Sequence, residues 1–408
     1  MEGLEVAAAG ERVDLNMPAF SAPTRITNPL FPISMQESVL LLGRVDGKAF
    51  RTEVTLLPDT RIIEWQDRRV ETLVSQYVAY LDGRLHEVAY DFYAQADDGS
   101  VWYFGEDVFN VEDGAIVDTH GTWIAGKDGP AAMIMPARPQ VGDVYRPENI
   151  PGFVFEEVTV TSVGQPLDGP LAPIDGGLVI EELHMDGSTE DKSFAPGYGE
   201  FFTSGGGDIE AVALAVPTDA ISTKPPSELV TLEAGAAGIV EAAGSGDWGA
   251  TLAAVDEMTA AWDRHRAGEV PKLIEPRMSE ALDSLADAVR ARDAARATQA
   301  AIDTARWSLD LQLRHRPAVE IDLARLGLWA DQLVLDAGAV DAAAVSGDFF
   351  VMDYIRDRVL HALDGAEATR FNTILEELQA GVGDEDLAAA SGSAARLREF
   401  IAGIHLAS

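Results

Sequence analysis

The chain has 408 residues, with 68 acidic and 30 basic side chains, 47% hydrophobic residues and no cysteine. The net charge of −38 excludes a typical nucleic-acid-binding protein, because neutralising phosphates requires a basic surface and the chain has only five lysines. The lack of cysteine excludes thiol catalysis, disulfides, iron–sulfur clusters and thiolate zinc sites. The hydrophobic fraction is typical of globular proteins, and the length predicts two or three domains.

The N-terminal sequence, MEGLEVAAAGERVDL, has neither the basic start nor the apolar core of a signal peptide. No run of 18 apolar residues is present, so we expect no transmembrane segment. Acidic residues are spread along the chain without a tail or block, which is typical of a solubilising surface.

The first half carries the pattern of an antiparallel meander. Eight Asp-Gly pairs lie between residues 46 and 187, and this dipeptide suits the two positive-φ positions of a type I′ hairpin turn. The segments between the pairs are rich in β-branched and aromatic residues, as in RLHEVAYDFYAQ. We therefore expect an irregular N-terminal segment over residues 1–27 and an antiparallel β domain over residues 28–222.

The sequence changes character near residue 225. The segment STKPPSELV predicts a stiff, Pro-rich linker over residues 223–230. Over residues 231–408, Ala, Leu, Asp and Arg recur with a spacing near 3.6, which is typical of helices. We expect an α-helical bundle of about eight helices in four hairpins, with the second helix of each hairpin capped by Asp247, Asp293, Asp348 or Asp384. The predicted fold class is α+β.

The densest aromatic cluster is YDFYAQADDGSVWYFGED, residues 90–107. Strand alternation places Trp102, Phe104 and Glu106 on one face and Tyr103 and Asp107 on the other. One interpretation is a hairpin that packs a core, since cross-strand aromatic pairs stabilise sheets. The other is a pocket wall, because pockets combine aromatic walls with a few polar groups. The candidate ligand-binding residues are Tyr90, Phe92, Trp102, Phe104, Glu106, Asp107 and Trp123.

A weaker pattern concerns metal binding. Glu182, His184 and Asp186 alternate onto one face of a probable strand, and His120 is a fourth candidate ligand, although a strand histidine is more often a surface or core residue. The motifs of serine hydrolases, P-loop proteins, zinc proteases and dinucleotide-binding folds are absent. Catalytic residues are therefore unknown, and we predict no cofactor, since no haem, Fe–S, nucleotide or thiolate zinc signature appears.

Four motifs carry a family resemblance: Asn28-Pro29-Leu30-Phe31-Pro32-Ile33, DFYAQADDGSVWYFGED, TWIAGKDGPAAMIMPARPQVGDVY and FAPGYGEFF. Over residues 28 to about 202 the chain resembles a largely uncharacterised family of bacterial secreted or envelope proteins, whose β-rich domain is similar to the half-barrel of lipoprotein carriers. This resemblance implies an extracytoplasmic location and a concave sheet that could hold an apolar ligand. It implies no catalytic residue, and the second half resembles a helical domain appended in some relatives.

Three functions remain open at this point. The first is a non-catalytic envelope or secreted protein whose β half-barrel binds an apolar or amphipathic ligand and whose helical domain mediates interactions. The second is a hydrolase that uses Asp91, Glu106 or Asp107 with His120. The third is a metal-binding protein with His and carboxylate ligands. The expected partners are a small apolar ligand or a protein, and no nucleic acid.

Overall fold

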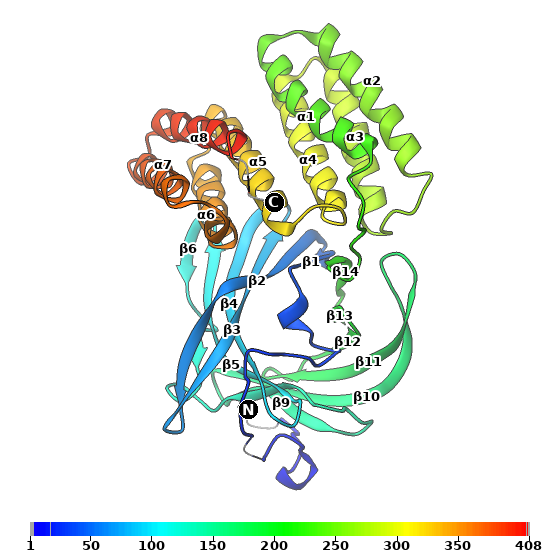
Figure 1. Cartoon of the computed structure of the whole chain (residues 1–408), viewed down its shortest axis with the longest axis vertical. Helices are drawn as coiled ribbons and strands as arrows, with labels where there is room; N and C mark the ends of the chain where they lie inside the picture. The colour runs from blue at the N-terminus through cyan, green and yellow to red at the C-terminus, as the bar shows by residue number, and fades with distance from the viewer. Residues whose placement is uncertain (1–3, 17, 405, 407–408) are drawn as a thin grey trace. The chain divides into compact units, whose positions relative to one another are not determined.

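The structure is a computed structural model that describes residues 4–16, 18–404 and 406. It divides into two compact units (Figure 1). The β unit comprises Met1–Glu112 and Ile116–Thr218, and the helical unit comprises Asp113–Ala115 and Asp219–Ser408. An antiparallel sheet is thus followed by helices, and the predicted fold class is confirmed.

In the described part of the chain, fourteen strands form one open antiparallel sheet. The spatial order is β6-β5-β4-β3-β2-β1-β14-β13-β12-β11-β10-β9, with β7 and β8 pairing with β5. Successive strands are paired from β1 to β6 and from β9 to β14, and at the centre of the sheet the first strand pairs with the last. The bounds are β1 (Ser38–Val45), β2 (Lys48–Trp65), β3 (Arg68–Leu81), β4 (Arg84–Gln95), β5 (Val101–Glu112), β6 (Ala115–Asp118), β7 (Trp123–Ile124), β8 (Ala132–Met135), β9 (Val144–Ile150), β10 (Val154–Asp168), β11 (Pro173–His184), β12 (Thr189–Ala195), β13 (Gly199–Gly205) and β14 (Asp208–Val216).

Three of the Asp-Gly pairs form the expected hairpin turns. Asp46-Gly47, Asp82-Gly83 and Asp113-Gly114 have positive φ at both residues, with values between 47° and 78°. Among the described residues, the Asp of each of the other five pairs lies outside the left-handed region. The dipeptide therefore marks the ends of strands more reliably than it marks the turn type.

The sheet curves around the N-terminal segment that contains the short 3₁₀ helix η2 (Ile33–Met35) (Figure 1); a second 3₁₀ helix, η1 (Ala9–Glu11), precedes it. Asn28 holds the segment in place, since its Nδ2 donates to the carbonyl oxygens of Gly99 at 3.2 Å and Pro136 at 3.0 Å. Phe31 and Ile33 then enter the core of the β unit.

The described helical unit contains eight α-helices, which pack as α1–α4 and α5–α8. The caps Asp247 and Asp293 accept hydrogen bonds from Ala250 N and Arg296 N, as predicted. The other two predicted caps are wrong, because Asp348 lies buried inside α6 and Asp384 ends α7; the caps there are Asp341 and Asp386. The bounds are α1 (Ser227–Ser245), α2 (Trp248–His265), α3 (Ile274–Ala291), α4 (Ala294–Gln312), α5 (Ala318–Gly338), α6 (Ala342–Val359), η3 (Leu360–Ala362), α7 (Gly365–Gly383) and α8 (Leu387–Ala402). Among these described helices, none has both the length and the apolar character that crossing a membrane requires.

Candidate functional site

The β unit holds a cavity of about 490 Å³. Its walls come from β1 to β4, from β12 to β14 and from the N-terminal segment. The apolar part of the lining includes Phe31, Val39, Leu41, Phe50 and Val54, and the polar part is dominated by carboxylates. A cavity of this size, with an apolar wall and a few polar groups, has the composition of a small-molecule site.

The lining of this cavity carries more negative than positive charge. Five acidic side chains reach it, and Lys192 is the single basic residue among the described lining residues. The Lys192 ammonium pairs with the buried Glu182 carboxylate at 2.5 Å, so its charge is already matched. The acidic lining residues are Asp91, Glu190, Glu200, Asp208 and Glu210.

Two of the cavity carboxyls, those of Asp91 and Glu210, have pKa values raised well above the ordinary range. Burial raises the pKa of Asp91 to about 7, although hydrogen bonds from Tyr103 and Tyr93 oppose this shift. Burial likewise raises the pKa of Glu210 to about 7, against a hydrogen bond from the Thr52 hydroxyl. Both carboxyls are therefore partly protonated near neutral pH, because removal from water penalises the charged form.

Strand register explains why these polar groups face one another. Ser75 on β3 lies directly opposite Asp91 on β4. On the other side of the cavity, Thr203 on β13 lies opposite both Glu210 on β14 and Lys192 on β12. Residues directly across a strand pair project to the same face of the sheet, so register alone assembles a polar belt on this face.

A second group of acids adjoins Asp91. Tyr103 Oη donates to Asp91 Oδ1 at 2.8 Å, and Asp91 is the register partner of Glu106. Burial raises the pKa of Glu106 to about 10, with further contributions from Asp91 and Glu148. Glu106 and Glu148 hydrogen-bond to each other, which requires a proton on one of them.

The predicted aromatic ligand residues lie in the core. Among the described residues, none of the seven candidates lines the cavity. Phe92, Trp102, Phe104 and Trp123 are buried members of the main core cluster. Tyr90 is half-buried, with its hydroxyl 3.3 Å from Gln76 Nε2. The core-packing interpretation accounts for these side chains.

The predicted face of Glu106 is wrong. Glu106 lies with Tyr103 and Asp91, whereas Asp107 pairs with Arg61 at 2.5 Å and Arg61 lies over Phe92 on the opposite face. The β4–β5 register shifts between Asp91 and Tyr93, and an irregularity of this kind breaks strand alternation.

Gly105 makes this irregularity possible. Its φ is +112°, a value that other residues rarely adopt. A Cβ at this position would lie 2.0 Å from the carbonyl oxygen of Trp123 on the neighbouring strand β7. A side chain there would therefore separate β5 from β7.

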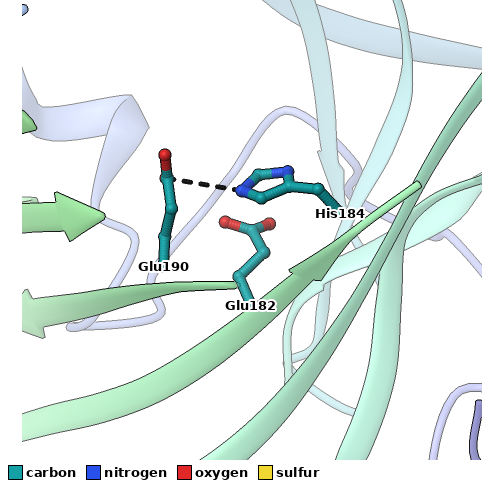
Figure 2. Close-up of side chains that lie close together, drawn as sticks. All are labelled: Glu182, His184 and Glu190. Carbon is teal, nitrogen blue, oxygen red and sulfur yellow. Dashed lines mark ion pairs between the residues drawn. The ribbon is translucent and has the colours of Figure 1, made fainter. Parts of the chain in front are cut away.

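Three potential metal ligands also come together, as Figure 2 shows: Glu182, His184 and Glu190 lie within 4.8 Å of one another. Glu182 and His184 were predicted, and Glu190 was not. Glu190 lies on β12, opposite Glu182 on β11, so only the hairpin register reveals it.

The other two metal candidates lie elsewhere. Asp186 accepts hydrogen bonds from the Ser188 backbone and hydroxyl within its turn, at 2.8 and 2.6 Å. His120 is exposed, and its ring lies 5.5 Å from that of Phe153. His120 therefore joins neither the metal cluster nor the buried acids.

The carboxylates around this cluster already have cationic partners. His184 lies between Glu156 and Glu190, with Nδ1 and Nε2 each 3.5 Å from a carboxylate oxygen. These two carboxylates raise the pKa of His184 to about 10. The protonated His184 and the Lys192 ammonium thus already supply positive charge to these carboxylates, and binding a metal through His184 requires the ring to lose its proton.

The chain matches no known family model and no curated protein sequence. Only the residues of this chain therefore indicate what the cavity can bind. Sequence alternation could have found Asp91 and Tyr93, which lie on the face of β4 opposite to Phe92. No local pattern marks Glu200 or Glu210, because strands from distant parts of the chain bring them together.

Proposed function

We propose that the β unit is a non-catalytic binding domain that holds a small amphipathic molecule in its cavity. The observation that carries this proposal is the cavity of about 490 Å³, whose lining combines apolar and aromatic side chains with buried carboxyls. Binding pockets for small molecules span roughly 300–1,000 Å³ and have this mixed lining.

The chemistry of the lining supports an amphipathic rather than a purely apolar ligand. Val39, Leu41 and Val54 offer an apolar surface, whereas Asp91 and Glu210 offer hydrogen-bonding groups. Each of these two carboxyls accepts a hydrogen bond from a hydroxyl group within the protein. A purely apolar ligand would displace water from their remaining acceptor positions without replacing its hydrogen bonds, which is unfavourable.

A cavity-filling substitution tests the proposal. Val54→Trp on β2 adds a large side chain to the cavity wall, and Ile62→Trp adds the same side chain at an exposed position of the same strand. In native mass spectrometry of protein purified from its own host, we expect a bound small molecule on the wild type and on Ile62→Trp, and a loss of that molecule from Val54→Trp.

Either of two results would contradict the proposal. Equal occupancy of the two tryptophan variants would show that the molecule binds outside the cavity. A clean apo mass for the wild type, together with no binding from a library of amphipathic compounds, would leave the cavity without a binding role.

The family resemblance of residues 28 to about 202 supports an extracytoplasmic location, in the envelope or secreted, with the helical unit as an interaction domain. Fractionation of the host cells tests this part. Recovery of the protein only with cytoplasmic markers would contradict it.

A carboxylate hydrolase is the second candidate function. Asp91 and Glu106 are register partners whose pKa values are raised to about 7 and about 10, so a base and an acid face each other. Hydrolysis of nitrophenyl glycosides or esters by the wild type, abolished in Asp91→Asn and retained in His120→Ala, would favour this function. The absence of hydrolysis would exclude it for these substrates.

A further inference from the structure

Three carboxylates of the cavity lack a cationic partner in the described part of the chain. Among the described residues, Asp91, Glu200 and Glu210 form no ion pair. Each is instead hydrogen-bonded by a hydroxyl group, from Tyr103, Thr203 and Thr52 respectively. Hydroxyl groups contribute no positive charge, so this part of the cavity is negative whenever its acids ionise.

The neighbouring cluster is different. Glu182 pairs with Lys192, and Glu156 and Glu190 both pair with His184. Each of its three carboxylates therefore has a cationic partner within the cluster, whereas Asp91, Glu200 and Glu210 have none among the described residues. A cation that enters the cavity would be attracted to the latter three carboxylates.

A second observation concerns a buried hydroxyl group beside Asp91 that lacks a hydrogen-bond partner. Ser75 is 0% exposed and lines the cavity, and its Oγ has no hydrogen-bond partner among the described residues. Ser75 lies directly opposite Asp91 in the β3–β4 register. Buried hydroxyls are nearly always hydrogen-bonded in folded proteins, so an unpartnered one at a cavity wall points to a partner supplied from outside.

Aromatic rings adjoin this pair of polar groups. Tyr77 follows Ser75 by two residues on β3, and Tyr93 follows Asp91 by two residues on β4, and both line the cavity. Burial raises the pKa of the Tyr77 hydroxyl, and the nearby carboxylates of Glu210, Glu87, Glu200 and Asp91 raise it further. Aromatic faces bind ammonium groups, which adds to the attraction of the carboxylates.

We propose that the cavity binds a small organic cation, a molecule with a protonated amine on an apolar or aromatic body. The ammonium group donates hydrogen bonds to Asp91 and Ser75, while Glu200 and Glu210 face it from β13 and β14. The apolar body lies against Val39, Leu41 and Val54. This inference rests on the proposed function, since it names the class of molecule that the cavity holds.

Binding of such a cation should strengthen as pH rises through about 7, where Asp91 and Glu210 lose their protons. A protonated carboxyl offers no charge to an ammonium, and a bound ammonium in turn favours the ionised carboxylate. The titratable groups that face these two carboxyls are Tyr77, Glu87, Tyr93, Tyr103, Glu106, Glu190, Lys192 and Glu200.

Two matched fluorescent probes test the inference on the full chain. Dansylcadaverine carries a primary ammonium on an aliphatic chain with an aromatic group, and its N-acetyl derivative has the same body without the charge. At pH 8, we expect dansylcadaverine to bind at least about tenfold more tightly than the N-acetyl derivative in fluorescence anisotropy, a ratio that corresponds to ~1.4 kcal/mol.

Substitutions in the cavity test which residues bind the ammonium group. Asp91→Asn should weaken dansylcadaverine about tenfold, and Ser75→Ala should weaken it several-fold, while the N-acetyl probe is unaffected by either change. Glu210→Gln should weaken the cationic probe in the same direction. Glu181→Gln, which removes a charge at an exposed position on β11, is the control and should alter neither probe.

The outcomes separate the inference from the proposed function. Equal affinity for the two probes, or an Asp91→Asn variant that folds normally and binds dansylcadaverine as the wild type does, overturns cation recognition. If Val54→Trp then still abolishes binding of both probes, ligand binding by the cavity stands. If neither probe binds the wild type, cation recognition also fails, and the native mass spectra decide the proposed function separately.

Discussion

The cavity of the β unit and the interior of the helical unit both hold buried ionisable side chains, and they neutralise them in different ways. In the helical unit, Arg325 on α5 donates to Asp322 Oδ1 at 2.9 Å and to Asp310 Oδ1 on α4 at 2.8 Å. Arg358 on α6 lies 3.6 Å from the same Asp322 oxygen. In the cavity of the β unit, Asp91 and Glu210 are neutralised by protons instead.

This difference separates a structural use of buried charge from one that can serve binding. A guanidinium that contacts two carboxylates is held in a fixed geometry, and its removal leaves buried charges uncompensated. A proton on a carboxyl leaves readily when a competing cation arrives. The permanent pairs therefore join helices, whereas the protonated acids keep a site adaptable.

The largest effect should follow from breaking the helical network. Arg325→Met removes the cation between Asp310 and Asp322, whose side chains are at most 3% exposed, and should cost about 3–5 kcal/mol in the free energy of unfolding. Urea denaturation followed by circular dichroism measures it. Arg290→Ala, which breaks an exposed pair with Asp287, should cost less than about 1 kcal/mol. Similar losses for the two variants would contradict the structural role of the buried network.

A smaller effect should appear when the cavity acids become permanently neutral. The folded-state pKa values of Asp91 and Glu210 are raised to about 7, so folding favours their protonated forms. Their contribution to stability is present at low pH and is lost as pH rises from the ordinary carboxyl range through about 7.

The double variant Asp91→Asn/Glu210→Gln should remove this loss. It should be more stable than the wild type at pH 8, on the order of 1–3 kcal/mol, and should differ little at pH 4.5. Urea midpoints at the two pH values measure the change. If the stability of the double variant depended on pH as that of the wild type does, the raised pKa values of Asp91 and Glu210 would be contradicted.

The smallest effect should come from the cluster of Glu182, His184 and Glu190. His184→Ala leaves Glu156 and Glu190 without the cation between them and should cost about 1 kcal/mol at pH 6, since the side chain is 25% exposed. Because the pKa of His184 is raised to about 10, its contribution is complete below about 6.5 and disappears as pH rises through about 10. Thermal unfolding at pH 6 and pH 10.5 measures it, with exposed His86→Ala as the control. If the loss of stability caused by His184→Ala were larger at pH 10.5 than at pH 6, the charged state assigned to His184 would be contradicted.

The sequence by itself determined the two structural classes and their order along the chain. Periodicity is a local property: alternation in RLHEVAYDFYAQ allows a strand, and the 3.6-residue spacing after residue 230 allows a helix. Asp247 and Asp293 were predicted as caps because capping involves only neighbouring residues. Asp348 was assigned to a turn for the same local reasons, yet the turn occurs at Asp341 and Asp348 is buried within α6.

The tertiary structure alone decided which acids share the cavity. Asp91 and Glu210 are far apart in the sequence, and they line one cavity because β1 pairs with β14 at the centre of the sheet. The face on which Glu106 lies also depended on a nonlocal event, the register shift beside Gly105 where β7 approaches β5. Pairing between distant strands carries no local signature, so the sequence predicted a sheet and its abundant acids, while only the folded sheet assembled them into a site.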